Sequence, residues 1–263
     1  MRLVTWNINS ARLRLPLLQK LIAELEPDVV CLQEIKGETA VFPGEPLKAL
    51  GFEHQHVRGM KGYNGVAILS RHKFKPLPFA NWCGKDDARH IAIEFKNGVE
   101  LHNFYVPAGG DIPDPAQNDK FAHKLQFVDE MLVWSKKGKN KSRIMVGDLN
   151  IAPLPEDVWS HKQLLDVVSH TPVETEKLTR LQESADWADS ARLLRPAPEK
   201  LYSWWSYRAA DWAKSDKGRR LDHIWLSQDV AKKLKGGDTL KEARGWQQAS
   251  DHAPVWADLS LSL

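Results

Sequence analysis

The chain of 263 residues is long enough to bury a large core, as one α/β domain or as two small ones. Its net charge of +3 is compatible with an anionic partner without requiring one. Two cysteines, Cys31 and Cys83, are too few for a disulfide scaffold or a thiolate metal site. The sequence has no stretch with the apolar length of a membrane span or a secretory leader, so we expect a cytoplasmic protein that contacts no membrane.

The first 34 residues predict a β-α-β unit. Residues 2–8 are typical of a strand, residues 15–26 have apolar positions at helical spacing, and residues 28–34 form a second apolar run after Pro27. No Pro/Gly/Ser-rich linker or low-complexity tract divides the composition. We therefore expect one domain that spans residues 1–263.

The remaining elements predict an α/β sandwich of mixed sheets with helices outside. Helices are expected near 118–135 and over the Glu- and Leu-rich stretch 174–194. Strands are expected at 63–71, 90–95, 100–106, 143–148, 220–227 and 252–261. Two basic runs, at 135–143 and 231–237, fit either a solvated surface where a helix gives way to a loop or a nucleic-acid patch.

The strand at 143–148 ends in an acid and an amide two positions apart, Asp148 and Asn150. Side chains at i and i+2 of an extended chain lie on one face, so both can offer oxygen atoms to a single point. Taken alone, Gly-Asp-Leu-Asn is equally typical of a turn.

Similar strand ends recur along the chain, which favours a shared site over a set of turns. Each of five apolar segments carries carboxylate or amide groups at one end: Asn7 and Asn9, Glu34, Asp148 and Asn150, Asp222, and Asp251 with His252. Oxygen ligands with a single imidazole and no thiolate suit Mg²⁺, with Mn²⁺ as an alternative, far better than zinc. The chemistry this indicates is metal-assisted hydrolysis of a phosphate ester.

His252 requires a partner if it is to hold a positive charge against a phosphate oxygen. Its neighbour Asp251 is a poor candidate, because adjacent residues of a strand point to opposite faces. Asp222, at the end of another strand, can accept from the ring and fix its tautomer.

These motifs resemble the exonuclease III family of abasic-site DNA endonucleases, within the endonuclease/exonuclease/phosphatase superfamily. The resemblance runs over nearly the whole chain in the family's order: TWNINSAR, PDVVCLQEIK, YNGVAILSR, NFYVPAGG, MVGDLNIAP, YSWWSYR, RLDHIWLS and SDHAPVWADL. It implies a four-layered α/β sandwich, in which two packed mixed β-sheets are flanked by helices. It also implies Mg²⁺-dependent attack of water on a DNA phosphodiester.

The resemblance implies a role for each residue of the set. Glu34 is the expected principal metal ligand, and the full metal set is Asn7, Glu34, Asp148, Asn150 and Asp251. Asp148 is expected to orient or activate the water, and His252, held by Asp222, to steady the charge on the phosphate. Tyr105 stands where this family places a tyrosine against the scissile phosphate. The expected catalytic set is Tyr105, Asp148, Asn150, Asp222 and His252.

DNA contacts follow from the same resemblance. Trp204 and Leu221 match the region that lines the abasic-sugar pocket, although eleven tryptophans in the chain leave a core position equally open for Trp204. Lys124 resembles a family phosphate contact. Ala108 is a departure, because the family usually has an amide side chain there, and backbone N–H groups of Gly109 and Gly110 could take over that contact.

The resemblance therefore implies a DNA repair nuclease that cuts 5′ to an abasic site, with 3′-to-5′ exonuclease and 3′-end-cleaning activity. Its expected partner is double-stranded DNA with abasic sites or blocked 3′ ends, bound by a monomer. An alternative enzyme is a phosphatase or phosphodiesterase on inositol phosphates or phospholipid head groups, against which Tyr105 and Trp204 argue. A silent member that only binds DNA is disfavoured by the intact acidic set.

Overall fold

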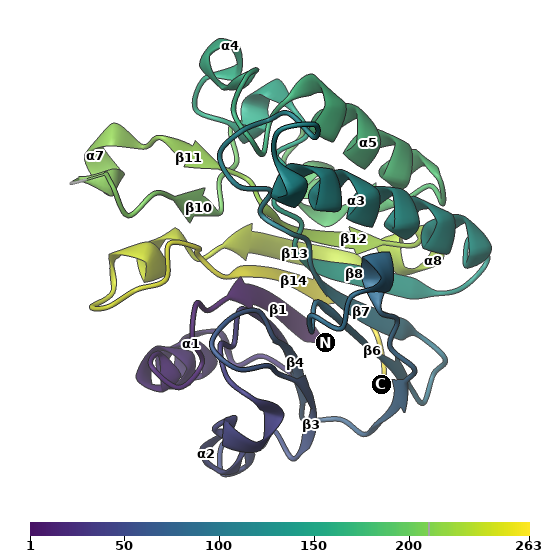
Figure 1. Cartoon of the computed structure of the whole chain (residues 1–263). Helices are drawn as coiled ribbons and strands as arrows, with labels where there is room; N and C mark the ends of the chain where they lie inside the picture. Colours follow the sequence, from purple (N-terminus) through teal and green to yellow (C-terminus); the bar gives the residue numbers. More distant parts are fainter. Residues whose placement is uncertain (210) are drawn as a thin grey trace.

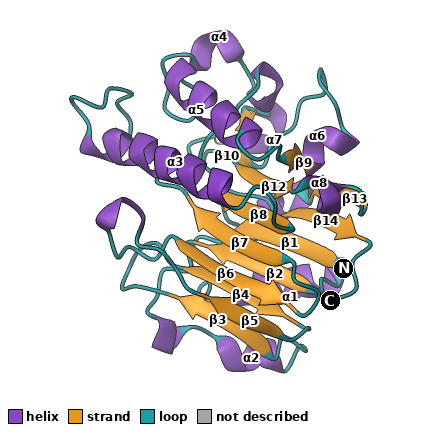
Figure 2. Ribbon diagram, turned by 90° about the vertical axis from the view of Figure 1, so that its right-hand side faces the viewer, coloured by secondary structure: helices purple, strands orange, loops and turns teal. Residues whose placement is uncertain are grey.

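The computed structural model describes residues 1–209 and 211–263, whose strands form two six-stranded sheets and one short hairpin (Figures 1 and 2). The first sheet has the order β13 (Leu234–Thr239), β14 (Val255–Leu259), β1 (Arg2–Asn7), β2 (Val29–Gln33), β4 (Val66–Ser70) and β3 (His54–Arg58). The second has the order β5 (Phe74–Leu77), β6 (His90–Phe95), β7 (Glu100–Tyr105), β8 (Arg143–Asp148), β12 (Asp222–Leu226) and β9 (Ala188–Asp189). The hairpin pairs β10 (Trp204–Trp205) with β11 (Gly218–Arg219).

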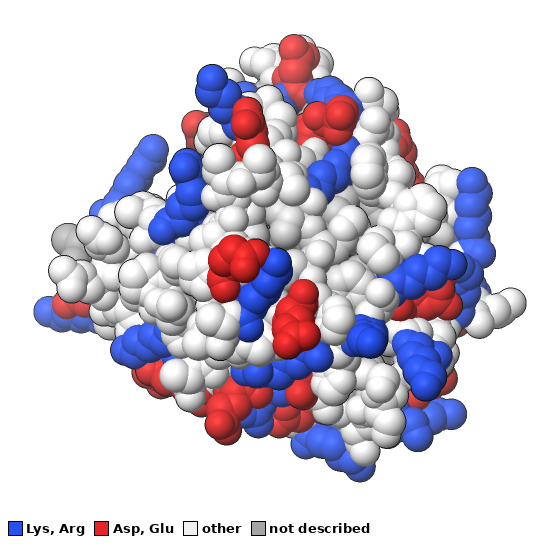
Figure 3. Space-filling model, turned by 90° about the horizontal axis from the view of Figure 1, so that it is seen from below, with Lys and Arg blue, Asp and Glu red and all other residues white. Residues whose placement is uncertain are grey.

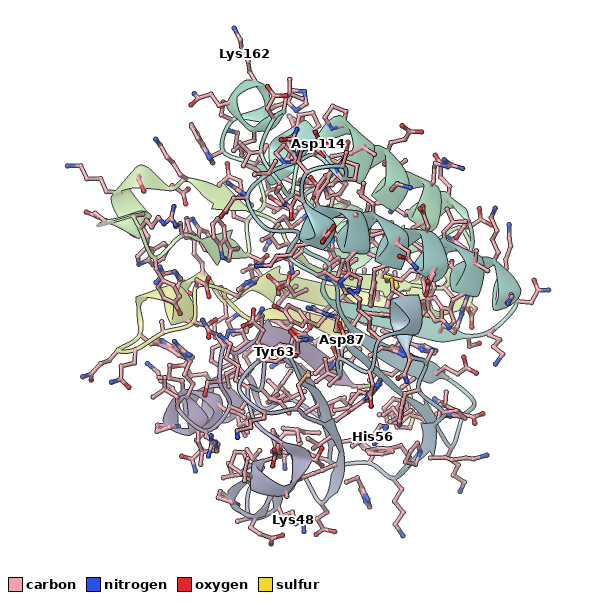
Figure 4. All side chains as sticks on the ribbon, viewed as in Figure 1. Lys48, His56, Tyr63, Asp87, Asp114 and Lys162 are labelled. Carbon is pink, nitrogen blue, oxygen red and sulfur yellow. The ribbon has the colours of Figure 1, made fainter. Side chains whose placement is uncertain are left out.

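Helices cover the outer face of each sheet, so the molecule has the four layers that the sequence predicts (Figure 2). The longer helices are α1 (Leu15–Leu25), α3 (Asp119–Lys137) and α5 (Pro172–Glu183). The shorter ones are α2 (Gly44–Lys48), α4 (His161–Leu164), α6 (Ser190–Leu194), α7 (Trp212–Ser215) and α8 (Gln228–Ala231). Helices α4 and α2, which carry Lys162 and Lys48, lie at opposite ends of the molecule (Figure 4).

The alternation of side chains along the strands explains the layers. In β1, Leu3 faces the second sheet and packs in the central core, whereas Val4 and Trp6 face α1. In β7, Leu101 belongs to the central core and Phe104 packs towards α3. Strands that are buried on both faces consist almost entirely of apolar residues, as β2 and β4 do.

Strand register brings the polar strand ends together. β1 and β2 run parallel with Asn7 opposite Gln33, so Asn7 lies beside the residue that precedes Glu34. In the second sheet, Asp148 pairs with Tyr105 on one side and with Asp222 on the other. The ends of five strands therefore meet at one edge of the sandwich.

The structure corrects the helix expected over 174–194. The helix α5 ends at Glu183, and the chain turns so that β9 can pair with β12 before α6 begins at Ser190. Trp187 is buried, its indole N–H donates to Ser135 Oγ at 2.8 Å, and the Asp189 side chain caps α6. The tertiary contacts of Trp187 and Asp189 therefore outweigh the helix propensity of residues 184–189.

The edge strands β3, β5 and β13 and the β10–β11 hairpin are not predicted from the sequence. The first basic run spans the last residues of α3, which ends at Lys137, and the loop up to β8, whereas the second runs from the end of α8 into β13 at Leu234. On the face in Figure 3, basic and acidic side chains are interspersed. None of the described helices combines the length and apolar character needed to cross a bilayer.

Two buried histidines make the stability of the fold depend on pH. His90 Nε2 lies 3.2 Å from His102 Nδ1, His102 contacts Glu100, and His90 stacks on Phe104 at 4.3 Å between centroids. Burial lowers the pKa of both histidines, and for His90 the neighbouring His102 and the charge of Arg58 add to the effect. Glu100 opposes the effect of burial on His102, whereas Arg143 and Lys141 add to it.

We expect the free energy of unfolding to fall as the pH is lowered from 7 to 5. Both rings bind a proton less readily in the fold than in the unfolded chain, which takes up protons below about 6.5, so each ring costs up to about 1.4 kcal/mol per pH unit. Urea unfolding at several pH values measures this slope. His90→Phe should reduce the slope by the contribution of one proton, up to about 1.4 kcal/mol per pH unit. If His90→Phe leaves the slope unchanged, His90 does not contribute to the pH dependence of stability.

Candidate active site

Glu34 follows β2 in a left-handed conformation, with φ of 51°, which turns its carboxylate into the site. Oε1 accepts from Tyr105 Oη at 2.7 Å and from Asn7 Nδ2 at 3.0 Å, and Oε2 pairs with Lys36 Nζ at 2.9 Å. Burial raises the pKa of Glu34, but the Asn7 hydrogen bond and the charge of Lys36 outweigh it and lower that pKa overall. The carboxylate is therefore held in its ionised form.

Asp148 is buried at the end of β8 and is held by amide groups. Asn7 Nδ2 donates to Asp148 Oδ2 at 2.9 Å, and Asn150 Nδ2 donates to the same oxygen at 3.1 Å. The Asn150 backbone N–H donates to Asp148 Oδ1 at 3.0 Å, because Asn150 adopts a φ of 54°. Asn7 Nδ2 thus links Asp148 to Glu34, while Asn7 Oδ1 accepts from the Asn9 backbone N–H at 3.2 Å.

His252 pairs with Asp222, as the alternation argument predicts. His252 Nδ1 lies 2.8 Å from Asp222 Oδ2, and Ser203 Oγ donates to the same oxygen at 2.6 Å. The other ring nitrogen, Nε2, lies 3.7 Å from Asp148 Oδ2. The ring thus stands between two buried carboxylates.

Burial and neighbouring charges shift the pKa values of both Asp148 and His252. Burial raises the pKa of Asp148 to about 7, and the nearby Asp222 adds to this although His252 opposes it. Burial alone would lower the pKa of His252, but Asp222 and Asp148 outweigh it and raise that pKa to about 10. At neutral pH the ring carries a proton, and Asp148 is poised to exchange one.

A second polar chain connects Asp251 to Glu34. Asp251 Oδ1 accepts from Asn9 Nδ2 at 3.3 Å, and Oδ2 accepts from the indole N–H of Trp204 at 2.9 Å. Lys36 Nζ donates to Asn9 Oδ1 at 2.6 Å while it pairs with Glu34. Asp251 therefore faces the side of Glu34, whereas Asp222 lies behind His252.

A cavity of about 730 Å³ opens over these groups. At one end it is lined by Glu34, Tyr105, Asp148, Asn150, Asp251 and His252, and at the other by Trp159, Val168, Ser169, Trp204, Arg219 and Leu221. The first end is acidic with one imidazole, and the second combines the apolar side chains of Trp159, Val168, Trp204 and Leu221 with the polar ones of Ser169 and Arg219. Such a cavity can hold a phosphate ester together with the group attached to it.

Residues 4–252 match the model of the Endonuclease/Exonuclease/phosphatase family. Exodeoxyribonuclease III of Haemophilus influenzae is 31% identical over 274 residues, which cover 98% of this chain and 99% of that protein. The chain belongs to the exonuclease III branch of this family. It is therefore a hydrolase of the exodeoxyribonuclease III and AP endonuclease type.

Solved structures of exonuclease III relatives have the same fold. An AP endonuclease from Archaeoglobus fulgidus superposes with a TM-score of 0.92 at 28% identity and covers 99% of this chain and 100% of its own. A 3′ phosphatase from Neisseria bound to product DNA hairpin gives a TM-score of 0.91 at 31% identity, with the same coverage. These likenesses agree with the sandwich expected from the sequence.

Lys124, expected to contact a DNA phosphate, is buried beneath the site and does not line the cavity. Its side chain is fully buried, and its ammonium group pairs with Glu174 at 2.5 Å. It also donates to the backbone oxygens of Asn150 at 2.7 Å and Ala108 at 3.2 Å. Lys124 thus ties the strand end of Asn150 to the 106–110 loop, and the prediction of a phosphate contact is wrong for this conformation.

Trp204 and Leu221 both line the cavity. The core position considered for Trp204 is instead occupied by its neighbour Trp205. Trp204 is half-buried and packs near Leu221, whereas Trp205 is buried and its indole N–H donates to Asp216. Gly109 and Gly110 both have positive φ, and a Cβ on Gly109 would lie 2.9 Å from Lys124 Cδ. Ala108 lines the cavity, so its small side chain leaves that wall open.

Asn9, noted in the sequence among the polar strand ends, proves to be a link to Asp251. Sequence reasoning missed three residues of the site: Lys36, Ser203 and Arg219. Lys36 lies beyond the end of β2, where both it and Glu34 have positive φ, so strand alternation gives no signal for it. Ser203 and Arg219 belong to the hairpin region, whose strands are too short for a pattern to predict them.

Proposed function

We propose that this chain is a Mg²⁺-dependent DNA repair nuclease that hydrolyses the phosphodiester 5′ to an abasic site. We propose further that it has 3′-to-5′ exonuclease and 3′-end-cleaning activity on duplex DNA. The observation that carries the proposal is one cavity in which Glu34, Asp148 and His252, with Asp222 behind it, lie beside the wall that contains Trp204. The first part fits a phosphate and the second fits a deoxyribose without its base.

The donor set fits a divalent cation. Four carboxylates, on Glu34, Asp148, Asp222 and Asp251, face only two cationic side chains, Lys36 and His252. Glu34 and Asp251 are the residues we expect to hold Mg²⁺, together with Asp148. A bound ion would polarise a phosphate oxygen and neutralise charge on it.

Asp148, Asp222 and His252 also lie close enough together to hold an ion. Their hydrogen bonds argue for another role, because His252 Nδ1 is already committed to Asp222 at 2.8 Å. A ring that shares a proton with a carboxylate acts as an acid or as a cation. We therefore assign the ion to the Glu34 side of the site.

The side chains can then divide the hydrolytic work. Asp148 accepts a hydrogen bond from the attacking water and can take its proton, because its pKa is raised to about 7. Asn7 and Asn150 hold the carboxylate in place. The protonated His252, fixed by Asp222, donates from Nε2 to a phosphate oxygen as negative charge develops there. Tyr105 keeps Glu34 oriented through its hydroxyl group.

A substrate panel tests the proposal. Purified protein would be given a duplex with one abasic site, a duplex with a 3′-phosphate end, and an inositol polyphosphate, each with Mg²⁺ and with EDTA. We expect Mg²⁺-dependent cleavage of both DNA substrates and no release of phosphate from the inositol compound. Release from the inositol compound with intact DNA would contradict the proposal and support the phosphatase alternative.

We predict that Trp204→Ala weakens cleavage at an abasic site by about tenfold to a hundredfold. The lost wall contact is on the scale of about 1 to 3 kcal/mol. Cleavage of a plain 3′ end should fall less, because that substrate does not require the sugar pocket. Trp204→Phe is the control, since it keeps an aromatic wall but removes the indole hydrogen bond to Asp251. Equal losses on both substrates, with an unchanged melting temperature, would exclude Trp204 from substrate choice.

A further inference from the structure

Two adjacent arginines near the cavity have opposite surroundings. Arg220 is buried and fully paired: Nε lies 2.6 Å from Asp157 Oδ1 and Nη1 lies 2.7 Å from Asp189 Oδ2. Arg219 donates from Nη1 to two neutral oxygens, Val168 O at 3.0 Å and Ser169 Oγ at 2.8 Å. Its Nε is buried and has no hydrogen-bond partner among the described residues.

No ion pair of the described part of the chain includes Arg219, although a carboxylate lies in the same wall. That carboxylate, Glu174, is taken by Lys124 at 2.5 Å and by the backbone N–H groups of Ser169 and Thr171. Charged side chains inside proteins are nearly always paired, because an unpaired ion loses its hydration without compensation. Arg219 is thus a cation that has no carboxylate within ion-pair distance among the described residues, although the charge of Glu174 acts on it from farther away.

Arg219 stands in the wall that the substituent of the scissile phosphate would meet. It lines the same cavity as Asp148 and His252, and its guanidinium lies 5.1 Å from the centroid of the Trp204 ring. Trp204 in turn donates to Asp251. One indole ring therefore separates the unpaired cation from the acidic end of the cavity.

We propose that Arg219 and Ser169 form a subsite for an anionic group attached to the scissile phosphate. The enzyme would then prefer a 3′-phosphate ester that carries a short carboxylate-bearing fragment over the same ester with a neutral fragment. The guanidinium fork matches a carboxylate, and the Ser169 hydroxyl can add a hydrogen bond. This inference rests on the proposed phosphodiester hydrolysis at the same site.

The chemistry at phosphorus is unchanged by the subsite. The water oxygen forms a new bond to phosphorus, the bond from phosphorus to the DNA 3′ oxygen breaks, and that oxygen takes a proton to leave a 3′ hydroxyl. The released phosphate keeps its fragment, and the carboxylate takes no part in bond making. Arg219 therefore determines which ester is held, not how it is cut.

Two nicked duplexes that differ in one group test the subsite. One carries a 3′-phosphoglycolate, and the other carries the 2-hydroxyethyl ester of the 3′ phosphate, which is similar in size but lacks the carboxylate. We would measure kcat/KM on both for the wild type, Arg219→Leu and Arg219→Lys. Arg208→Leu is the matched control, because it removes an exposed arginine from the rim of the same cavity.

The wild type should prefer the glycolate ester by about tenfold to a hundredfold, the scale of a hydrogen bond to a charged group. Arg219→Leu should abolish that preference, Arg219→Lys should keep part of it, and Arg208→Leu should keep it whole. A general loss of structure cancels in the ratio of the two substrates. A preference that survives Arg219→Leu, or no preference in the wild type, would overturn the subsite. Failure to cut either ester would overturn the proposed function itself.

Discussion

Replacement of Glu34 by alanine should lower turnover on an abasic duplex by about a hundredfold or more, while the fold stays intact. The carboxylate lies beyond the end of β2, and its hydrogen-bond and ion-pair partners among the described residues are Asn7, Tyr105 and Lys36. Its loss should therefore remove the proposed metal ligand and little packing. A lost metal contact at the phosphate costs several kcal/mol at the transition state. Because the defect is one of metal affinity, high Mg²⁺ or Mn²⁺ should restore part of the activity.

Steady-state kinetics against metal concentration, with thermal melting in parallel, measure this effect. Glu45→Ala is the matched control, since it removes an exposed carboxylate from α2. The control should behave as the wild type in both measurements. A collapse of the melting temperature in Glu34→Ala, with no response to metal, would show instead that Glu34 supports the fold.

The second large effect is expected at the Asp222–His252 pair. His252→Asn removes the cation, and Asp222→Asn removes the charge that keeps the ring protonated, so each should lower turnover by about 10²- to 10⁴-fold. The two residues share the 2.8 Å contact and act as one unit. The double mutant should therefore be little worse than the worse single mutant.

A double-mutant cycle on kcat tests the pairing. Ser203→Ala provides a graded comparison, because Ser203 donates to the same Asp222 oxygen without touching the ring. Its effect should be smaller than that of either member of the pair. Strictly additive losses in the double mutant would show that Asp222 and His252 act independently.

The pairing illustrates what the sequence can predict. Strand periodicity identifies most buried strands, and alternation within a strand excludes Asp251 and leaves Asp222 as the partner of His252. Both inferences use only local geometry. The resulting contact joins residues 30 positions apart in the chain.

Contacts that depend on a distant partner could not be predicted in this way. Lys124 reads as an exposed cation of an amphipathic helix, and only the arrival of Glu174 from α5 makes its burial favourable. Arg219 and Arg220 are adjacent and alike in sequence, yet Asp157 and Asp189 pair only the second. The helix expected over 174–194 fails for a similar reason, since β9 forms only beside β12.

We propose above all that this site cuts DNA on the 5′ side of an abasic residue. The most direct measurement uses a duplex with a single abasic site, labelled at the 5′ end of the damaged strand, with Mg²⁺ or EDTA. We expect a Mg²⁺-dependent first product, seen at early times before exonuclease shortening, that ends in a 3′ hydroxyl at the preceding nucleotide and that a DNA polymerase can extend. A product that retains the abasic sugar at its 3′ end, or the same cleavage in EDTA, would contradict it.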